Sequence, residues 1–358
     1  MSELKISILS AAEEKAYNDF LSHHEGALWY HSLKYRNFLN AILENSEDIY
    51  LAAFIGDKIV GILPAFLKRL KDGTSVINSL PFFGSHGGVL IASDIQQSHN
   101  VRTKLMDKLF EISYQNKCLS LTIIDNPIAS KEDTYEQYFQ SSPSDIRTSQ
   151  ISDISIANID NLEEELMDKF HYKTRNMVRK SLKSNFVITH DESEESFQNL
   201  HALHEQNMHK IGGQTKPFLI FKAIQDTFTA CDDYLIYFAH KDGVVCAALL
   251  VFFYENYCEY FTPVVREEYR NQQPLSALIF QAMKDSVRRG IKYWNWGGTW
   301  LTQDGVYLFK KRWGAVDRKY SYYTKIFNKD LLHRTKEQIL QEVPYYYCLN
   351  FKDLDGSR

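Results

Sequence analysis

The chain has no apolar run long enough to cross a bilayer, which takes about 18–20 consecutive apolar residues. Its first residues, MSELKISILSAAEEKAY, carry several acidic side chains and no continuous apolar core, so they do not resemble a signal peptide. We therefore expect a cytoplasmic protein without a transmembrane segment. Peripheral contact with a membrane surface stays open.

The sequence is also poor in paired cysteines, metal-ligand motifs and nucleophile motifs. Its 5 cysteines are scattered, with no C-x-x-C pair, which predicts reduced structural thiols and no disulfide framework. The motifs G-x-x-x-x-G-K-[ST], G-x-S-x-G and H-E-x-x-H are absent. His201 and His204 have H-x-x-H spacing, but no acidic or cysteine ligand follows at a matching distance. We therefore predict no metal site.

The charge balance gives no general attraction for nucleic acid. The formal net charge is −4, and the aromatic runs lack the alternating basic residues of an RNA-recognition strand. We expect no DNA partner, although local basic clusters can still bind phosphates.

What the sequence does contain is a globular composition and an internal repeat. Of its 358 residues 44% are hydrophobic and 24% charged, and the length suggests two domains. Residues 48–66 and 233–253 each read as a β-hairpin, with aromatic and β-branched runs around a polar turn. Each is followed by a further strand, a helix and an apolar strand. This order, repeated about 185 residues apart, indicates duplicated α/β domains with mixed, twisted sheets flanked by helices.

The expected domain boundaries follow from this repeat. The polar stretch 141–150 is a plausible boundary, which gives an N-terminal domain over 1–150 and a C-terminal domain over 151–330. Residues 331–358 are expected to form a helix and an apolar tail that packs back on the body. Between the repeats, the pattern predicts one helix over 161–182 and a second over 195–210.

A helix that opens at Pro274 provides the first functional indication. Proline suits the first helical turn, and the N-terminus of such a helix offers free N–H groups to an anion. Here the chain resembles the GNAT acyltransferase superfamily, which places Gln/Arg-x-x-Gly-x-Gly/Ala at this turn to hold the coenzyme A pyrophosphate. Arg270 matches the first position, but Gln273 and Leu275 occupy the two small positions.

Tandem GNAT-like domains with an altered pyrophosphate loop resemble the FemAB/FemX group of aminoacyltransferases and its wider relatives. The segments VGILPA (60–65) and NSLPFFGSHGGVL (78–90) are similar to that group's "G-x-x-P" and "S-x-P-[FY]-x-x-x-G-G" signatures. TRNMVRKSLK (174–183) resembles its "Thr-Arg-x-x-Ile-Arg-Lys-Ala" helix. The closing "Gly…Gly-x-x-x-Phe-Lys-x-x-[WF]-Gly" element is matched through Gly298, Phe309, Lys310, Trp313 and Gly314.

The resemblance implies an acyl- or aminoacyltransferase that forms an amide on an amino group of a cell-envelope or glycan precursor, either a small molecule or lipid-linked. It implies that Lys310 is catalytic and stabilises the oxyanion that develops on the attacked carbonyl. The donor is acyl-CoA, an acyl carrier protein or an aminoacyl-tRNA, and no cofactor is expected to stay bound. The resemblance does not identify the general base. The candidates are the substrate itself, Asp304 and Glu259. The alternative is a non-catalytic, degenerate GNAT-like module that binds a phosphate-bearing ligand or partner.

Several other residues are predicted to bind substrate. Arg175 and Arg179 share a helix face, where they either contact phosphates or are simply solvated. By resemblance, Lys210 corresponds to a phosphate-binding arginine, and Lys34 and Arg36 lie near a second basic position. The remaining candidates are the strand residue Tyr260, for which core packing is the alternative, and the loop residue His86 as a base near a cleft. Phe309 is expected to contact substrate and to fix Lys310 by packing its helix on the sheet.

Overall fold

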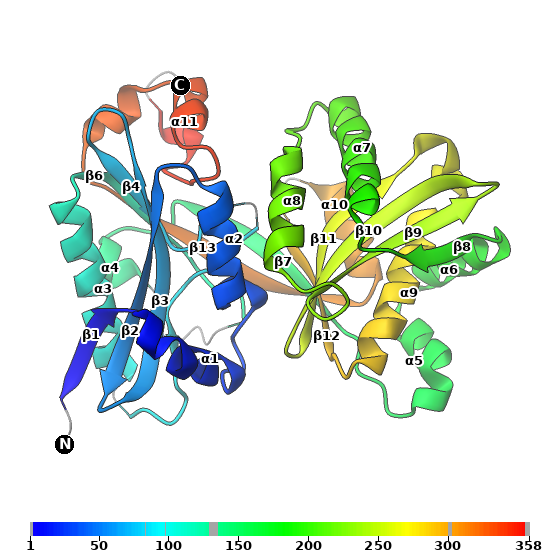
Figure 1. Cartoon of the computed structure of the whole chain (residues 1–358), viewed down its shortest axis with the longest axis horizontal. Helices are drawn as coiled ribbons and strands as arrows, with labels where there is room; N and C mark the ends of the chain where they lie inside the picture. The colour runs from blue at the N-terminus through cyan, green and yellow to red at the C-terminus, as the bar shows by residue number, and fades with distance from the viewer. Residues whose placement is uncertain (1–2, 83, 97, 129–134, 300–302, 355–358) are drawn as a thin grey trace. The chain divides into compact units, whose positions relative to one another are not determined.

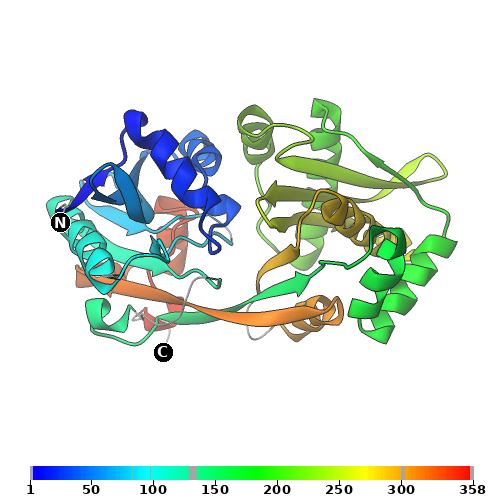
Figure 2. The same ribbon diagram turned by 90° about the horizontal axis from the view of Figure 1, so that it is seen from below.

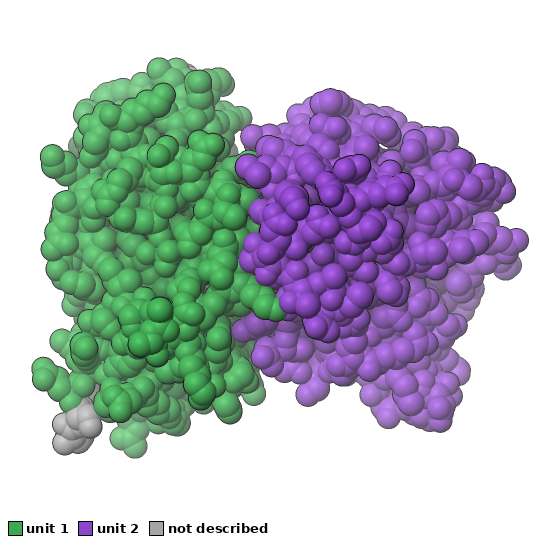
Figure 3. Space-filling view, viewed as in Figure 1, with its two compact units in different colours: residues 1–147, 319–358 green, residues 148–318 purple. Residues whose placement is uncertain are grey.

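The computed structural model describes residues 3–82, 84–96, 98–128, 135–299 and 303–354. The chain divides into two compact units, coloured separately in Figure 3: unit 1 comprises residues 1–147 and 319–358, and unit 2 comprises residues 148–318. The expected boundaries lay at 150 and 330, whereas the units change at 147 and at 318.

Unit 1 is a mixed sheet with helices packed against it (Figure 1). Its strands follow the order β1-β2-β3-β4-β6-β13, with β5 beside β3, and all neighbours are antiparallel except the pair β4 and β6. The strands are β1 Leu4–Ile8, β2 Ser46–Ile55, β3 Lys58–Arg69, β4 Ser75–Asn78, β5 Leu90–Ile91, β6 Cys118–Ile124 and β13 Ala315–Ile326. The helices are α1 Glu14–Ser22, α2 Leu33–Ile42, α3 Ser98–Gln115, α4 Glu136–Phe139 and α11 Lys336–Glu342.

Unit 2 repeats this plan. Its strands follow the order β7-β12-β11-β10-β9-β8, and only β11 and β12 are parallel. The strands are β7 Asp145–Asp153, β8 Val187–His190, β9 Tyr234–Lys241, β10 Val244–Tyr254, β11 Tyr257–Val265 and β12 Tyr293–Thr299. The helices are α5 Leu162–Lys169, α6 Tyr172–Lys183, α7 Glu194–Ile211, α8 Phe218–Thr227, α9 Pro274–Arg288 and α10 Asp304–Arg312. Figures 1 and 2 show α9, with α5 and α6, on one face of this sheet, and α7 with α8 on the other.

The predicted fold class is confirmed, because both sheets are mixed and carry helices. The two predicted hairpins are the pairs β2–β3 and β9–β10, and each turns at the polar residues that the sequence indicated. The helix expected from Pro274 begins at that residue and ends at Arg288. Local patterns of apolar and turn residues therefore specified these elements correctly.

One prediction between the repeats is wrong. The single helix expected over 161–182 is interrupted: Phe170 has extended backbone angles and buries its ring, and His171 caps α6 by accepting a hydrogen bond from the Lys173 N–H at 3.3 Å. The polar stretch 141–150 contains the change of unit after residue 147, and β7 begins within it at Asp145. Its first serines are exposed, whereas Thr148, Ser149 and Gln150 are buried.

The end of the chain folds onto unit 1. The segment expected to form a helix and an apolar tail contains the short α11 and then an irregular run of tyrosines. Tyr346 donates its hydroxyl to Ser46 at 2.9 Å, and the Tyr347 N–H donates to Asn78 Oδ1 at 2.7 Å. These bonds attach the tail to β2 and β4. No described helix has the length and apolar character that a membrane span requires.

The core of unit 2 is centred on tryptophans that join α10 to the sheet. Trp313 is fully buried, and its ring lies 5.0 Å from Phe170 and 5.9 Å from Trp296, measured between centroids. Trp296 in turn donates its indole N–H to Ser152 at 2.8 Å. A helix of only two and a half turns has little stability in isolation, so this packing holds α10 in place.

We predict that Trp313→Ala lowers the free energy of unfolding by about 3–5 kcal/mol, because it leaves a large cavity in a packed core. Denaturant unfolding followed by far-ultraviolet circular dichroism measures this loss. The control is Val316→Ala on β13, whose side chain is 57% exposed and should change stability little. Equal effects of the two substitutions would show that Trp313 does not hold the core together.

Candidate active site

Lys310 on α10 has a buried ammonium group that is bound to the end of β12. The residue is 6% exposed, and Nζ donates to Thr299 Oγ1 at 2.8 Å, to the Gly298 carbonyl at 3.2 Å and to the Gly297 carbonyl at 3.4 Å. Burial lowers the pKa of Lys310 to about 8, although the negative charge of Glu259 opposes this shift. A buried amine whose pKa is lowered toward neutral pH is typical of active sites.

A β-bulge in β12 positions the backbone carbonyls that accept hydrogen bonds from Lys310. Pairing with β7 shifts between Asn295 and Gly298, and Gly297 adopts φ +68°, a conformation that favours glycine. The Gly297 N–H donates to Asn295 Oδ1 at 3.0 Å. The strand continues to Thr299, and the Gly297 and Gly298 carbonyls accept hydrogen bonds from Lys310.

A buried carboxylate lies beside the lysine. Glu259 on β11 is 4% exposed and accepts a hydrogen bond of 2.7 Å from Asn295 Nδ2. Asn295 Oδ1 accepts another from the Ser149 hydroxyl at 3.3 Å. The side chain of Gln150 extends this network, since its Oε1 accepts from Thr299 Oγ1 at 3.3 Å and its Nε2 donates to the Tyr307 carbonyl at 3.2 Å. These bonds fix the carboxylate and the ammonium relative to each other.

The two central strands separate where these polar groups lie. The parallel strands β11 and β12 pair only over Tyr257–Glu259 and Tyr293–Asn295, although β11 runs on to Val265 and β12 to Thr299. Glu259 and Asn295 are therefore the last paired positions. Beyond them β11 has its own bulge against β10, at Phe261, where the register skips one residue. Strands that diverge leave ladder N–H and C=O groups for an extended, amide-bearing ligand.

The start of α9, where the superfamily binds pyrophosphate, differs from the expected pattern in side chains but not in backbone. Gln273 adopts φ +65°, the conformation for which glycine is favoured. Its side chain covers the turn, donating from Nε2 to the Arg270 carbonyl and accepting from the Ser276 hydroxyl, both at 3.1 Å. The turn before α9 therefore combines a positive φ with a glutamine side chain that is hydrogen-bonded to Arg270 and Ser276.

Two of the predicted phosphate ligands meet at one carboxylate. Lys210 at the end of α7 and Arg270 before α9 each form an ion pair of 3.1 Å with the same Glu267 oxygen. All three side chains are more than half exposed, so each pair contributes little stability. The structure thus places these two cations together beside the α9 terminus, where an incoming phosphate would compete with Glu267.

The other predicted residues of unit 2 have mainly packing contacts. The Tyr260 ring packs against Trp294 and Trp296, at centroid distances of 6.1 and 5.0 Å, and burial raises its pKa. Phe309 lies 5.9 Å from Trp296, which agrees with a role in fixing α10. On α6, Arg175 is half-buried and donates to the Phe170 carbonyl at 3.1 Å, whereas Arg179 is exposed.

The remaining predicted residues belong to unit 1. Lys34 is exposed on α2, and Arg36 on the same helix pairs with Glu14. His86 is fully buried, with its ring against Tyr30 and Tyr320, and burial lowers its pKa to about 3. A neutral ring enclosed by aromatic residues suits packing, and its role as a base stays a prediction.

Sequence reasoning singled out the lysine but missed most of its surroundings. Glu259 was only one of two carboxylates considered as base, and Asp304, the other, is exposed. Ser149, Gln150 and Asn295 were not considered at all. The available signal was the run of polar residues in β7, which alternates poorly with apolar ones.

Comparison with known proteins identifies a domain that spans most of unit 2. Residues 168–311 match the family model of the acetyltransferase (GNAT) domain, a segment that contains Glu259, Asn295 and Lys310. No curated protein sequence matches the chain.

Several solved structures share the fold over nearly the whole chain. The structure of FemX matches with a TM-score of 0.71 at 15% identity, covering 91% of this chain and 98% of FemX. A tandem GNAT protein from the clavulanic acid biosynthesis pathway matches with a TM-score of 0.58 at 12% identity, covering 90% and 98%. The C-terminal domain of a putative lysylphosphatidylglycerol synthetase from Agrobacterium fabrum gives 0.53 at 8% identity, covering 95% and 99%.

These findings confirm the resemblance that the sequence indicated. The order of strands, the buried lysine after the last parallel strand and the matched domain agree with one another. Residues 168–311 match an acetyltransferase (GNAT) domain, and the chain has the fold of FemX and of the tandem GNAT protein.

Proposed function

We propose that unit 2 transfers an acyl or aminoacyl group to an amino group of a cell-envelope or glycan precursor. The observation that carries this proposal is the buried Lys310 ammonium, which lies beside the Glu259 carboxylate where β11 and β12 separate. A cation and a carboxylate at the end of diverging strands meet the two needs of amide formation, stabilisation of an oxyanion and removal of a proton.

In the proposed reaction the acceptor amine attacks the carbonyl carbon of the donor ester or thioester. The carbonyl oxygen becomes negative, and Lys310 donates to it by exchanging its weakest bond, the 3.4 Å contact to the Gly297 carbonyl. Glu259 accepts the proton that the amine nitrogen loses. The carbon–oxygen or carbon–sulfur bond then breaks, and the leaving alcohol or thiol takes up a proton.

The donor is proposed to carry a phosphate-bearing handle that meets Lys210 and Arg270 beside α9. Acyl-CoA, an acyl carrier protein and an aminoacyl-tRNA all fit this description. The helices α5 and α6 are short and no long helical hairpin is inserted among the described residues of unit 2, so a large tRNA-binding arm is absent from that part of the chain. This favours a thioester donor, with tRNA as the alternative that direct assay distinguishes.

The acceptor class rests on the resemblance to the FemAB group and on the lysylphosphatidylglycerol synthetase among the similar structures. Small-molecule and lipid-linked amino acceptors both remain within this proposal.

A second candidate function is a non-catalytic module that binds a phosphate-bearing ligand. Two observations favour it: all three N–H bonds of Lys310 already have acceptors, and the Gln273 side chain covers the α9 turn. In that case Lys310 would only hold α10 to β12.

Substitution of Lys310 separates the two candidates. We predict that Lys310→Ala lowers kcat for amide formation by about 10²–10³-fold, the usual cost of removing one oxyanion donor. Lys310→Arg should retain part of the rate because it keeps the charge. The assay follows amide product by mass spectrometry with acyl-CoA, acyl carrier protein and aminoacyl-tRNA donors against amino sugars and amino lipids.

The matched control is Lys311→Ala, which removes the neighbouring exposed lysine and its 3.2 Å ion pair with Asp317. This variant should keep the wild-type rate. Full activity of Lys310→Ala, or no product from any donor, would refute catalysis by Lys310 and leave the binding module.

We further predict that activity falls as the pH rises through about 8. The folded pKa of Lys310 is lowered to about 8, so the ammonium form that binds the oxyanion is present below this pH and is lost above it. Lys310→Arg should remove this alkaline limb, because arginine stays charged. Glu259→Gln should move the limb to lower pH, because Glu259 raises the lysine pKa. If the wild type, Lys310→Arg and Glu259→Gln lose activity over the same alkaline pH range, the titrating group belongs to the substrate.

The last prediction of this proposal concerns donor binding. Arg270→Ala should raise KM for the donor several-fold with little change in kcat, because a contact to a distant phosphate is the same in ground and transition states. Glu267→Gln should lower KM, since it releases both Lys210 and Arg270 from their shared partner. Initial rates at varied donor concentration measure both, and unchanged KM values would remove this turn from the donor site.

A further inference from the structure

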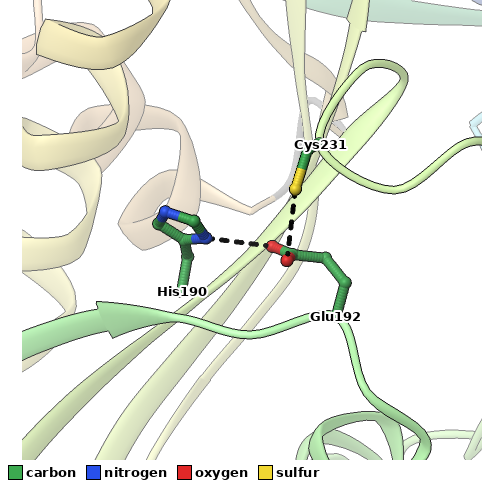
Figure 4. A group of neighbouring side chains, drawn as sticks. All are labelled: His190, Glu192 and Cys231. Carbon is green, nitrogen blue, oxygen red and sulfur yellow. Dashed lines mark hydrogen bonds and ion pairs between the residues drawn. The ribbon is translucent and has the colours of Figure 1, made fainter.

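We propose that His190, Glu192 and Cys231 of unit 2 bind a zinc ion. His190 ends β8, Glu192 lies in the turn before α7, and Cys231 lies in the turn before β9 (Figure 4). The three side chains point toward one another and bring together a ring nitrogen, a carboxylate and a thiol. None of them belongs to the candidate active site.

The spacing of the three donor atoms fits one small cation. His190 Nδ1 lies 3.4 Å from Glu192 Oε1, and Cys231 Sγ lies 3.5 Å from Glu192 Oε2. Ligand atoms of all three residues lie within 4.8 Å of one another. With metal bonds of about 2.0–2.3 Å, the ligands of a tetrahedral zinc ion lie about 3.2–3.8 Å apart, so only small side-chain movements would complete the site.

The chemistry of the donors selects the metal. A thiolate is a soft ligand that suits zinc and disfavours calcium and magnesium, while imidazole and carboxylate are also common zinc ligands. When zinc binds, the Cys231 thiol releases its proton to solvent, and the sulfur and Glu192 together supply two negative charges. Three protein ligands leave the fourth position to water.

The surroundings hold two of these ligands in place. The Glu192 side chain is 10% exposed and accepts a hydrogen bond of 3.4 Å from the Ile236 N–H. The Cys231 N–H donates to the Tyr234 carbonyl at 3.1 Å, which fixes the turn. One group opposes cation binding: the Arg289 guanidinium donates to the Cys231 carbonyl at 2.8 Å. Its single positive charge is less than the two negative charges of the ligands.

No sequence motif indicates this site, because Glu192 and Cys231 lie 39 residues apart. Our prediction of no metal site rested on the spacing of His201 and His204. Neither forms part of this cluster, since their ring nitrogens bond to the backbone of Lys216. An ion held by His190, Glu192 and Cys231 would tie the outermost strand β8 and the start of α7 to β9, and so would stabilise that edge of unit 2.

The test titrates the reduced, full-length protein with Zn²⁺ and with Co²⁺, whose thiolate charge-transfer absorption reports a sulfur ligand. We expect one ion per chain and the charge-transfer band. Cys231→Ser, His190→Ala and Glu192→Gln should each weaken binding at least tenfold, and Cys231→Ser should abolish the band. The matched controls are Cys246→Ser, a buried thiol on β10, and His240→Ala, a histidine on the neighbouring strand β9. Both should bind as the wild type does.

Thermal unfolding provides a second measurement. Zn²⁺ at 100 times its dissociation constant should raise the Tm of the wild type by roughly 5 °C, and that of Cys231→Ser by much less. Circular dichroism without metal checks that each variant is folded. Binding that is equally tight in the three ligand variants, or no binding with Zn²⁺ in excess, would overturn the proposal.

Discussion

The arrangement of unit 2 around its candidate active site depends on the burial of one ammonium group. Lys310 is enclosed by protein, and an enclosed charge is tolerated only when its hydrogen bonds are satisfied. Two carbonyls and a hydroxyl at the end of β12 meet that need, and Glu259 supplies a compensating charge nearby. The β-bulge at Gly297, the separation of β11 from β12 and the polar residues of β7 all belong to this one arrangement.

Apolar packing by a cluster of tryptophans also fixes the position of the Lys310 ammonium. Trp313 and Phe309 fix α10 against Trp296, and Trp296 is bound through Ser152 to β7. Because Lys310 lies between Phe309 and Trp313 in the sequence, the packing that anchors the helix also sets the position of its ammonium. An oxyanion donor must be fixed before the reaction to lower its barrier, so packing and chemistry are linked here.

The two candidate sites of unit 2 differ in what they need from the chain. The acyltransfer site combines residues of β7, β11, β12 and α10 that a buried network aligns. The proposed zinc site uses three partly exposed residues at the edge of the sheet, and its effect would be on stability. The cations near α9 form a third feature, in which Lys210 and Arg270 are held by Glu267 until a stronger anion competes.

The sequence by itself determined the elements whose signals are local. These elements are the two hairpins, the helix from Pro274 and the helix that carries Phe309 and Lys310. The sequence predicts them because hydrophobic periodicity, turn residues and proline act over only a few positions. Resemblance of short motifs then led to the acyltransferase fold and to Lys310.

Only the tertiary structure decided the rest. Ser149 and Gln150 are polar, yet they belong to β7 and lie in the sheet. Phe170 ends a helix because its ring is buried in the core. Glu192 contacts Cys231 because distant strands pair with each other. Each of these outcomes depends on contacts between residues far apart in the chain, which local patterns do not encode.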